Sequence, residues 1–178
     1  MDFILPCAIS QKEMKITDDV VSFPFFDAQP GEPESIYCES SALRSEFEKW
    51  HLRDNVTKKV RNFWIQWSKE KKGIAILILA ENENFLITKG IYDKGIALFF
   101  LNHVFQVWLP INAWDRFVDL ILSTDEGQLS TFEEDSFHWA VDATQDNMVL
   151  QIKSVRKDTI VIPMAEWLNL RELVSAIR

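Results

Sequence analysis

The spacing of hydrophobic and polar positions changes along the chain and predicts an N-terminal arm followed by two strand-rich blocks. Residues 1–35 hold four prolines and no sustained period, which predicts an irregular arm with one short edge strand near residues 20–26. Residues 41–52 carry apolar side chains at helical spacing behind Ser40, whose hydroxyl suits an N-cap. We therefore expect an N-terminal arm with one helix over residues 1–56.

The first strand-rich block predicts an antiparallel meander. Apolar and polar residues alternate over 63–68, and the run at 73–79 is apolar on both faces, as in a buried central strand. Further short strands, separated by tight turns, are expected at 85–90, 96–101 and 104–109. Pro110 then ends the sheet, and Asn112 can cap the helix that follows. We place this first sheet–helix unit over residues 57–124.

The pattern restarts after an acidic, polar linker that runs to Asp135. Strands are expected at 137–141, 148–152 and 159–162. Pro163 again precedes a helix, which continues to the C-terminus. This second unit is placed over residues 125–178, and the two units together, 57–178, are expected to form one compact domain.

The two predicted helices start in the same register. Residues 107–110 (Val-Trp-Leu-Pro) parallel residues 160–163 (Ile-Val-Ile-Pro), and Trp114 parallels Trp167. The apolar positions that follow match as well: Phe117 with Leu170, Leu120 with Leu173, and Ile121 with Val174. One small sheet cannot bury both of its faces, so a duplicated sheet–helix unit makes physical sense. The expected fold class is α+β, with two repeated units of antiparallel β-meander followed by an α-helix, and with Trp108, Trp114 and Trp167 in the core.

Charge is distributed unevenly along the sequence. The chain of 178 residues has a net charge of -8, which alone argues against a nucleic-acid ligand because phosphate attracts cations. Residues 57–103, however, hold 8 basic and 4 acidic side chains, a balance of +4, between two segments of -6 each. This basic segment indicates either a local strip for an anionic partner or charges that cluster on a solvated face.

Single-strand binding requires a cationic track for phosphates and aromatic faces for bases, and the basic segment holds both. The candidate nucleic-acid-binding residues are Arg61, Trp64, Trp67, Lys71, Lys72, Lys89 and Lys94, with Lys58, Lys59 and Lys69 beside them. Lys72 and Lys94 are expected to contact phosphates, and Trp64 or Trp67 to stack on a base. The competing interpretation is that the tryptophans fill a β-rich core and the lysines a solvated face.

Other chemistries are poorly supported by the sequence. The three histidines and two cysteines lack the spacing of metal ligands, and the acidic run at 133–135 is typical of a solvated linker. There is no glycine-rich phosphate loop and no nucleophile elbow, so we expect no cofactor and no enzymatic activity. The apolar runs are too short for a membrane helix, and the composition of the N-terminal residues leads us to expect no secretory signal there. Cys7 and Cys38 are expected to stay reduced in an intracellular protein.

A meander of about four strands that ends in a proline-started helix, repeated once, resembles the Whirly proteins. It also resembles their wider superfamily, with the transcriptional positive cofactor four and the kinetoplast guide-RNA-binding proteins. Whirly proteins carry a Lys-Gly-x-Ala-hydrophobic signature early in their first sheet, and matching residues stand here at 72–76 and again at 94–98. The resemblance covers about residues 65–178.

This resemblance implies a fold, a ligand and an assembly. Relatives of this kind bind single-stranded DNA or RNA across their sheets, in transcription, replication, repair or RNA handling. They also assemble as dimers or tetramers, which matches the apolar runs that exceed what one small domain should need to bury. A member of the same fold that makes protein–protein contacts instead of binding nucleic acid is the alternative.

Overall fold

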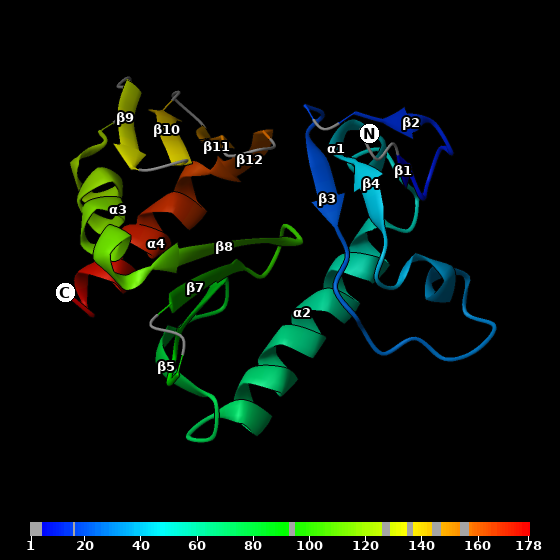
Figure 1. Ribbon diagram of the computed structural model, residues 1–178, viewed down its shortest axis with the longest axis horizontal. Helices are drawn as coiled ribbons and strands as arrows, with labels where there is room; N and C mark the ends of the chain where they lie inside the picture. Colours follow the sequence, from blue (N-terminus) through cyan, green and yellow to red (C-terminus); the bar gives the residue numbers. More distant parts are fainter. Residues whose placement is uncertain are drawn as a thin grey trace.

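The computed structural model describes residues 5–15, 17–92, 95–125, 129–134, 137–143, 147–153 and 157–178. Over these residues the chain is an α+β protein made of antiparallel sheets and helices. An N-terminal part with a long helix precedes two four-stranded sheets, and each of these sheets is followed along the chain by one helix (Figure 1). The expected α+β class is therefore confirmed.

Short elements fill the N-terminal part. Strand β1 (Leu5–Pro6) pairs with β2 (Glu13–Met14), β3 (Val20–Ser22) pairs with β4 (Ser41–Leu43), and the 3-10 helix η1 spans Pro33–Tyr37. The strand expected near residues 20–26 is present as β3. The prediction of one helix over 41–52 is wrong, because strand β4 occupies the first residues of this range and helix α1 covers only Arg44–Phe47. Pairing with β3 overrides the local helical spacing there.

The long helix α2 (Arg53–Lys71) occupies the segment in which the sequence predicted a first strand at 63–68, so that prediction is wrong. Val56, Val60 and Trp64 are buried at intervals of four residues, and one face of the helix is therefore buried along its length. The alternation over 63–68 is too short to compete with a helical spacing that extends over 19 residues. The expected boundary after residue 56 falls inside this helix.

The first large sheet contains β5 (Ile76–Glu81), β6 (Phe85–Gly90), β7 (Gly95–Phe100) and β8 (Phe105–Pro110), which are neighbours in chain order. Strand β5 begins later than expected because residues 73–75 form a turn in which Gly73 has a φ of 76°. Pro110 ends β8 and is itself the N-cap of helix α3 (Ile111–Ser123), so the cap expected at Asn112 is wrong by two residues. The fixed φ of proline suits this strand-to-helix position.

The second large sheet contains β9 (Leu129–Glu134), β10 (Phe137–Ala143), β11 (Asn147–Lys153) and β12 (Lys157–Pro163), and helix α4 (Met164–Ser175) follows it. Its strands are also neighbours in chain order. Strand β9 was missed, since its sequence is typical of an acidic linker. Within the described residues β9 is an edge strand that pairs with β10 alone, and an edge strand tolerates the polar residues that obscure its period.

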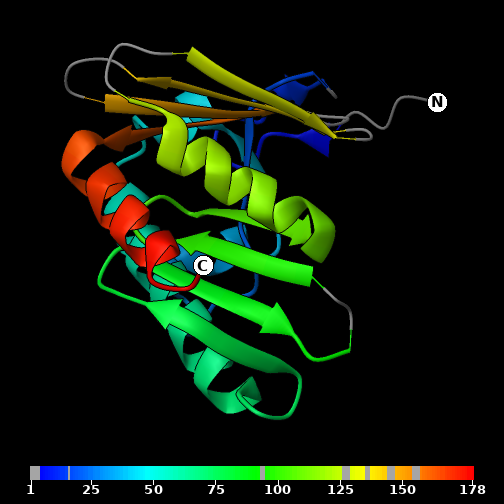
Figure 2. The same cartoon turned by 90° about the vertical axis from the view of Figure 1, so that its left-hand side faces the viewer.

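Helices α3 and α4 lie between the two large sheets (Figure 2). One hydrophobic core connects these elements. It includes Phe85 and Leu98 of the first sheet, Phe117 of α3, Leu150 of β11 and Trp167 of α4, each almost fully buried. Burial of a side chain of this size contributes roughly 1.5–3 kcal/mol, so the shared core fixes both sheets and both helices relative to one another.

Helix α2 covers the opposite face of the first sheet (Figures 1 and 2). Trp64 of α2 packs with Leu86 and Phe99 of the sheet in a second core, which also contains the N-terminal elements. The first sheet is therefore covered on both faces, as its apolar strands require. Of the two apolar runs that suggested a homo-oligomer, residues 96–101 are largely buried within a single chain, whereas Ile74 and Leu77 of the run at 73–79 are exposed.

A polar network joins α2, the first sheet and α4. Arg61 Nη1 donates a hydrogen bond to Asn102 Oδ1 at 3.2 Å, and Asn102 Nδ2 donates to Asn84 Oδ1 at 2.8 Å and to Glu166 Oε1 at 3.3 Å. His103 Nε2 lies 2.8 Å from Glu166 Oε2. Because these bonds reach three elements at once, they hold the helix in one orientation over the sheet.

Candidate nucleic-acid interface

Arg61 and Trp64, two of the predicted binding residues, lie on α2 and are already engaged within the protein. Trp64 is 4% exposed, and its ring centroid lies 5.2 Å from that of Phe99. Arg61 donates to Asn102. A buried indole presents no face to a base, so any stacking surface of this protein is found elsewhere.

Trp67 lies three residues further along α2, half-buried in a cleft on the outer side of the helix. Asp27 and Glu70 line the same cleft, and their carboxylates would repel phosphate. Trp67 is thus accessible, but its surroundings are acidic.

Two neighbours of the candidate lysines, Lys58 and Lys69, are exposed on α2, whereas Lys59 is paired. Lys59 Nζ lies 2.5 Å from Glu32 Oε2. This hydrogen bond raises the pKa of Lys59 and lowers the pKa of Glu32, so both groups remain charged at neutral pH. Lys59 therefore contributes little net charge to the surface.

Three candidate lysines gather at one end of the first sheet. Lys71 is the last residue of α2, Lys72 is its C-cap, and Lys89 in β6 pairs across the sheet with Leu77 of β5. No ion pair involves any of these three lysines within the residues that the structure describes. Their charges are therefore available to an anionic partner.

Backbone contacts hold the chain segments together at this end. Lys72 forms a β-bridge with Ile76, and Ile91 N donates to Ala75 O at 2.9 Å, which joins the end of β6 to the turn after α2. Lys94, the seventh predicted residue, lies outside the described residues. The glycine that follows it, Gly95, is the first residue of β7 and is described.

The sequence placed Trp108 in the core, and this prediction is wrong. Trp108 in β8 is 51% exposed, and its indole lies directly over Gly95 of the neighbouring strand. A Cβ atom built on Gly95 would lie 2.3 Å from Trp108 Nε1, closer than any real contact. Gly95 therefore makes the room in which the indole lies flat on the sheet. By contrast, Trp114 and Trp167 are buried, as expected.

A sequence signal for Trp108 did exist. In β8, Phe105, Val107 and Leu109 are buried, while Gln106 and Trp108 alternate with them and are exposed. The polar Gln106 marks that face of the strand as one that reaches water. Trp108 shares the face with Phe99, but it lies beyond the part that α2 covers.

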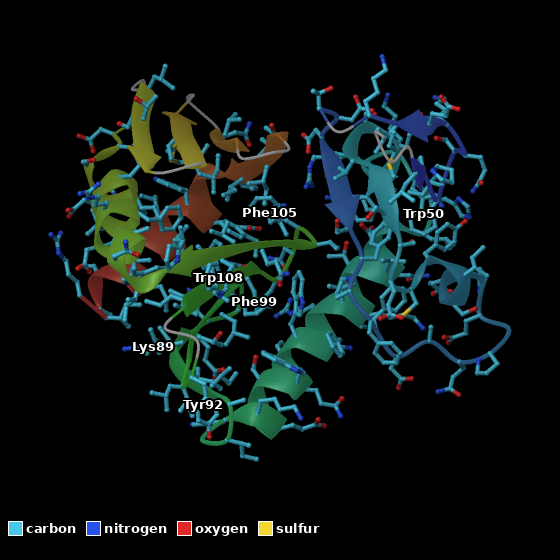
Figure 3. The ribbon with its side chains drawn as sticks, viewed as in Figure 1. Trp50, Lys89, Tyr92, Phe99, Phe105 and Trp108 are labelled. Atoms are coloured by element: carbon cyan, nitrogen blue, oxygen red, sulfur yellow. The ribbon has the colours of Figure 1, made fainter. Side chains whose placement is uncertain are left out.

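Further exposed apolar side chains lie at the same end of the sheet. Tyr92, just after β6, is 82% exposed, and Figure 3 shows Tyr92 and Lys89 at this end of the sheet and labels Trp108 in β8. We define the open end of the first sheet as Lys71, Lys72, Ile74, Leu77, Lys89, Ile91, Tyr92 and Trp108. Exposed apolar residues that gather in this way mark interaction surfaces in many proteins.

The open end offers cations and aromatic side chains. In the described part of the chain, no group of His, Cys, Asp and Glu side chains is arranged to hold a metal ion. Among the same residues, no helix is both long and apolar enough to cross a membrane.

The comparisons with known proteins add no relative. No protein-family model matches this chain, and no curated protein matches its sequence.

Proposed function

We propose that this protein binds single-stranded nucleic acid, without catalysing a reaction, at the open end of the first sheet. Trp108 and Tyr92 provide stacking faces, and Lys71, Lys72 and Lys89 contact phosphates. The observation that carries the proposal is the half-exposed Trp108 indole of β8, which lies over Gly95. The unpaired lysines lie at the same end of the sheet, beside β5 and β6. A protein of this kind acts inside the cell, in transcription, replication, repair or RNA handling.

The physical requirements of single-strand binding support this assignment. Stacking of a base on an aromatic side chain contributes about 1–3 kcal/mol, and it tolerates any sequence because every base has a π-face. Each phosphate contact releases counterions and changes the slope of log affinity against log salt by about -0.7. Three lysines therefore predict a slope of about -2, a modest salt dependence that suits a chain with a net charge of -8.

The proposal includes a Whirly-like arrangement of two duplicated units, residues 72–124 and 125–178. The correspondence of elements supports it: β5 begins at Ile76 and β9 at Leu129, 53 positions later, and α3 and α4 begin at the same offset. At this offset Trp108 corresponds to Val161, which is 53% exposed. A valine offers no stacking face, so the proposed base-binding function is restricted to the first unit.

Fluorescence anisotropy with labelled single-stranded DNA and RNA, at two salt concentrations, tests the proposed function. We expect binding that weakens with salt and that falls strongly in Trp108→Ala, while the salt slope of that variant stays near the wild-type value because stacking releases few ions. Val161→Ala, at the corresponding position of the second unit, is the matched control and should bind as wild type. Absence of binding to either nucleic acid at low salt would refute the proposal.

A protein-interaction function is the second candidate. Ile74, Leu77, Ile91 and Tyr92 add exposed apolar surface at the β5–β6 side of the open end, and such a surface also suits another protein or a second copy of this chain. Assembly as a dimer or tetramer would then bury the open end. Sedimentation velocity over a range of concentrations distinguishes the two functions. This candidate would be favoured if the wild type self-associates without binding nucleic acid, and if Tyr92→Ser abolishes the self-association.

A further inference from the structure

A second surface feature, separate from the open end, lies on the outer side of α2. It is a cleft of about 440 Å³ between α2 and the segment that follows β3. From α2 it is lined by Lys59, Asn62, Phe63, Gln66, Trp67 and Glu70, and from the segment by Phe25 and Asp27. Counted from Lys59, the other helical residues stand at i+3, i+4, i+7, i+8 and i+11, so they form one face of the helix. A cleft of this volume falls in the range of ligand sites in proteins.

Aromatic side chains form much of the wall of this cleft. Phe25 is 57% exposed, and its ring centroid lies 6.0 Å from that of Phe63 in an edge-on arrangement at 68°. Trp67 follows Phe63 by one helical turn and is half-buried. Phe25, Phe63 and Trp67 thus all contribute aromatic surface to the lining of the cleft.

The charges around the aromatic wall are predominantly negative. Asp27 and Glu70 are exposed on the two sides of the cleft, and Glu70 Oε1 accepts a hydrogen bond from Gln66 Nε2 at 2.9 Å. Lys59 is the one cation among the lining residues, and it pairs with Glu32 at 2.5 Å and with Glu34 at 4.0 Å. The positive charge of Lys59 is therefore already balanced by these two glutamates in the absence of a ligand.

We propose that this cleft binds an organic cation, a guanidinium or alkylammonium group. A cation over the face of tryptophan or phenylalanine is attracted by the ring quadrupole, and the carboxylates of Asp27 and Glu70 add Coulombic attraction. The same carboxylates repel phosphate, which separates this site from the nucleic-acid surface at the open end. Two sources of such a cation share this chemistry: a free quaternary ammonium compound, and the side chain of a basic protein segment.

Titration of the full chain with small cations, followed by NMR of the tryptophan indole N–H resonances, tests this inference. The Trp67 resonance is assigned as the one that is lost in Trp67→Phe. Choline represents the free compound, and N-acetylarginine methylamide represents the protein side chain. The neutral isostere 3,3-dimethylbutanol, at the same concentration, reports on apolar binding alone.

We expect both cations to shift the Trp67 resonance in a saturable way, and the neutral isostere to leave it unchanged. Glu70→Gln and Asp27→Asn keep the shape of the cleft and should each weaken binding about threefold. Trp67→Leu lacks the reporting resonance, so its binding is measured by isothermal titration calorimetry beside the wild type, and it should be about tenfold weaker. Glu172→Gln, which removes an exposed carboxylate on α4, is the matched control and should bind as wild type. The cation with the higher affinity identifies the source.

Two results would overturn the inference. One is a Trp67 shift caused equally by the neutral isostere, because binding would then not depend on charge. The other is the absence of a saturable shift with either cation at low salt. Neither result bears on nucleic-acid binding, since Trp108→Ala changes that function and leaves this cleft intact.

Discussion

Replacement of Gly95 by alanine should move the Trp108 indole away from the first sheet without unfolding it. The Cβ atom of the alanine would lie 2.3 Å from Trp108 Nε1 and 2.4 Å from both Cε2 and Cζ2. Carbon atoms at their optimal separation are about 3.5–4.0 Å apart, so the indole has to retreat by more than 1 Å. Trp108 is half-exposed and can rotate into solvent, whereas the backbone at Gly95 has no positive φ that would strain an alanine.

The expected effects on binding and on stability therefore differ. Loss of one stacking interaction, about 1–3 kcal/mol, corresponds to a loss of about fivefold to 150-fold in affinity for a single strand. Folding stability should change little, since alanine reduces the entropy of the unfolded chain by an amount worth about 0.4–1 kcal/mol. Fluorescence anisotropy measures the first quantity, and urea denaturation measures the second.

A double-mutant cycle with Trp108→Ala provides the control. If Gly95→Ala acts only by displacing the indole, it should have no further effect on affinity in the Trp108→Ala background. The NMR resonance of the Trp108 indole N–H shows whether the ring has moved. If the ring has moved and Gly95→Ala still binds a single strand with wild-type affinity, Trp108 is not a stacking face.

Three further predictions concern the lysines, the core and the ion pair. Lys71→Ala with Lys72→Ala should flatten the salt slope of single-strand binding by about 0.7 per lysine in anisotropy titrations; an unchanged slope would show that they do not contact phosphate. Trp64→Ala should lower the free energy of unfolding by about 3–5 kcal/mol in urea, and a loss below about 1 kcal/mol would contradict its place in the core. The hydrogen bond to Lys59 is the largest cause that lowers the pKa of Glu32 from 4.5. The pair therefore stabilises the folded protein fully above pH 4.5, and this stabilisation is lost as the pH falls through the lowered pKa of Glu32 in the folded state. Glu32→Gln should therefore reduce the loss of thermal stability on acidification, and an unaltered pH profile would argue against the pair.

The strands that were predicted best from the sequence have an apolar run of a few residues and are bounded by turn residues or proline. Strand β6 spans the expected residues 85–90, because turns precede and follow its apolar run. Pro110 and Pro163 each end a strand and cap a helix, as their fixed φ and missing N–H dictate. These features depend on a few neighbouring residues, so one sequence is enough to find them.

The features that the sequence missed depend on partners far along the chain. Residues 41–43 form a strand because β3 lies beside them, and β9 pairs with β10 in spite of its polar composition. Trp64 is buried and Trp108 is exposed because α2 covers only part of this face of the first sheet. Local spacing carries no information about the extent of that cover, so the sequence indicated Lys71, Lys72 and Lys89 but not Trp108 as an exposed aromatic residue.

Chemical-shift mapping with a short single-stranded oligonucleotide tests the central claim most directly. In a ¹H–¹⁵N spectrum of the wild-type protein at low salt, we expect the largest shifts at the Trp108 indole N–H and at the backbone of residues 71–77 and 89–92. The backbone of the second sheet should stay near its unbound positions. Largest shifts elsewhere, or a spectrum unchanged by the oligonucleotide, would contradict the assignment of the open end as a nucleic-acid interface.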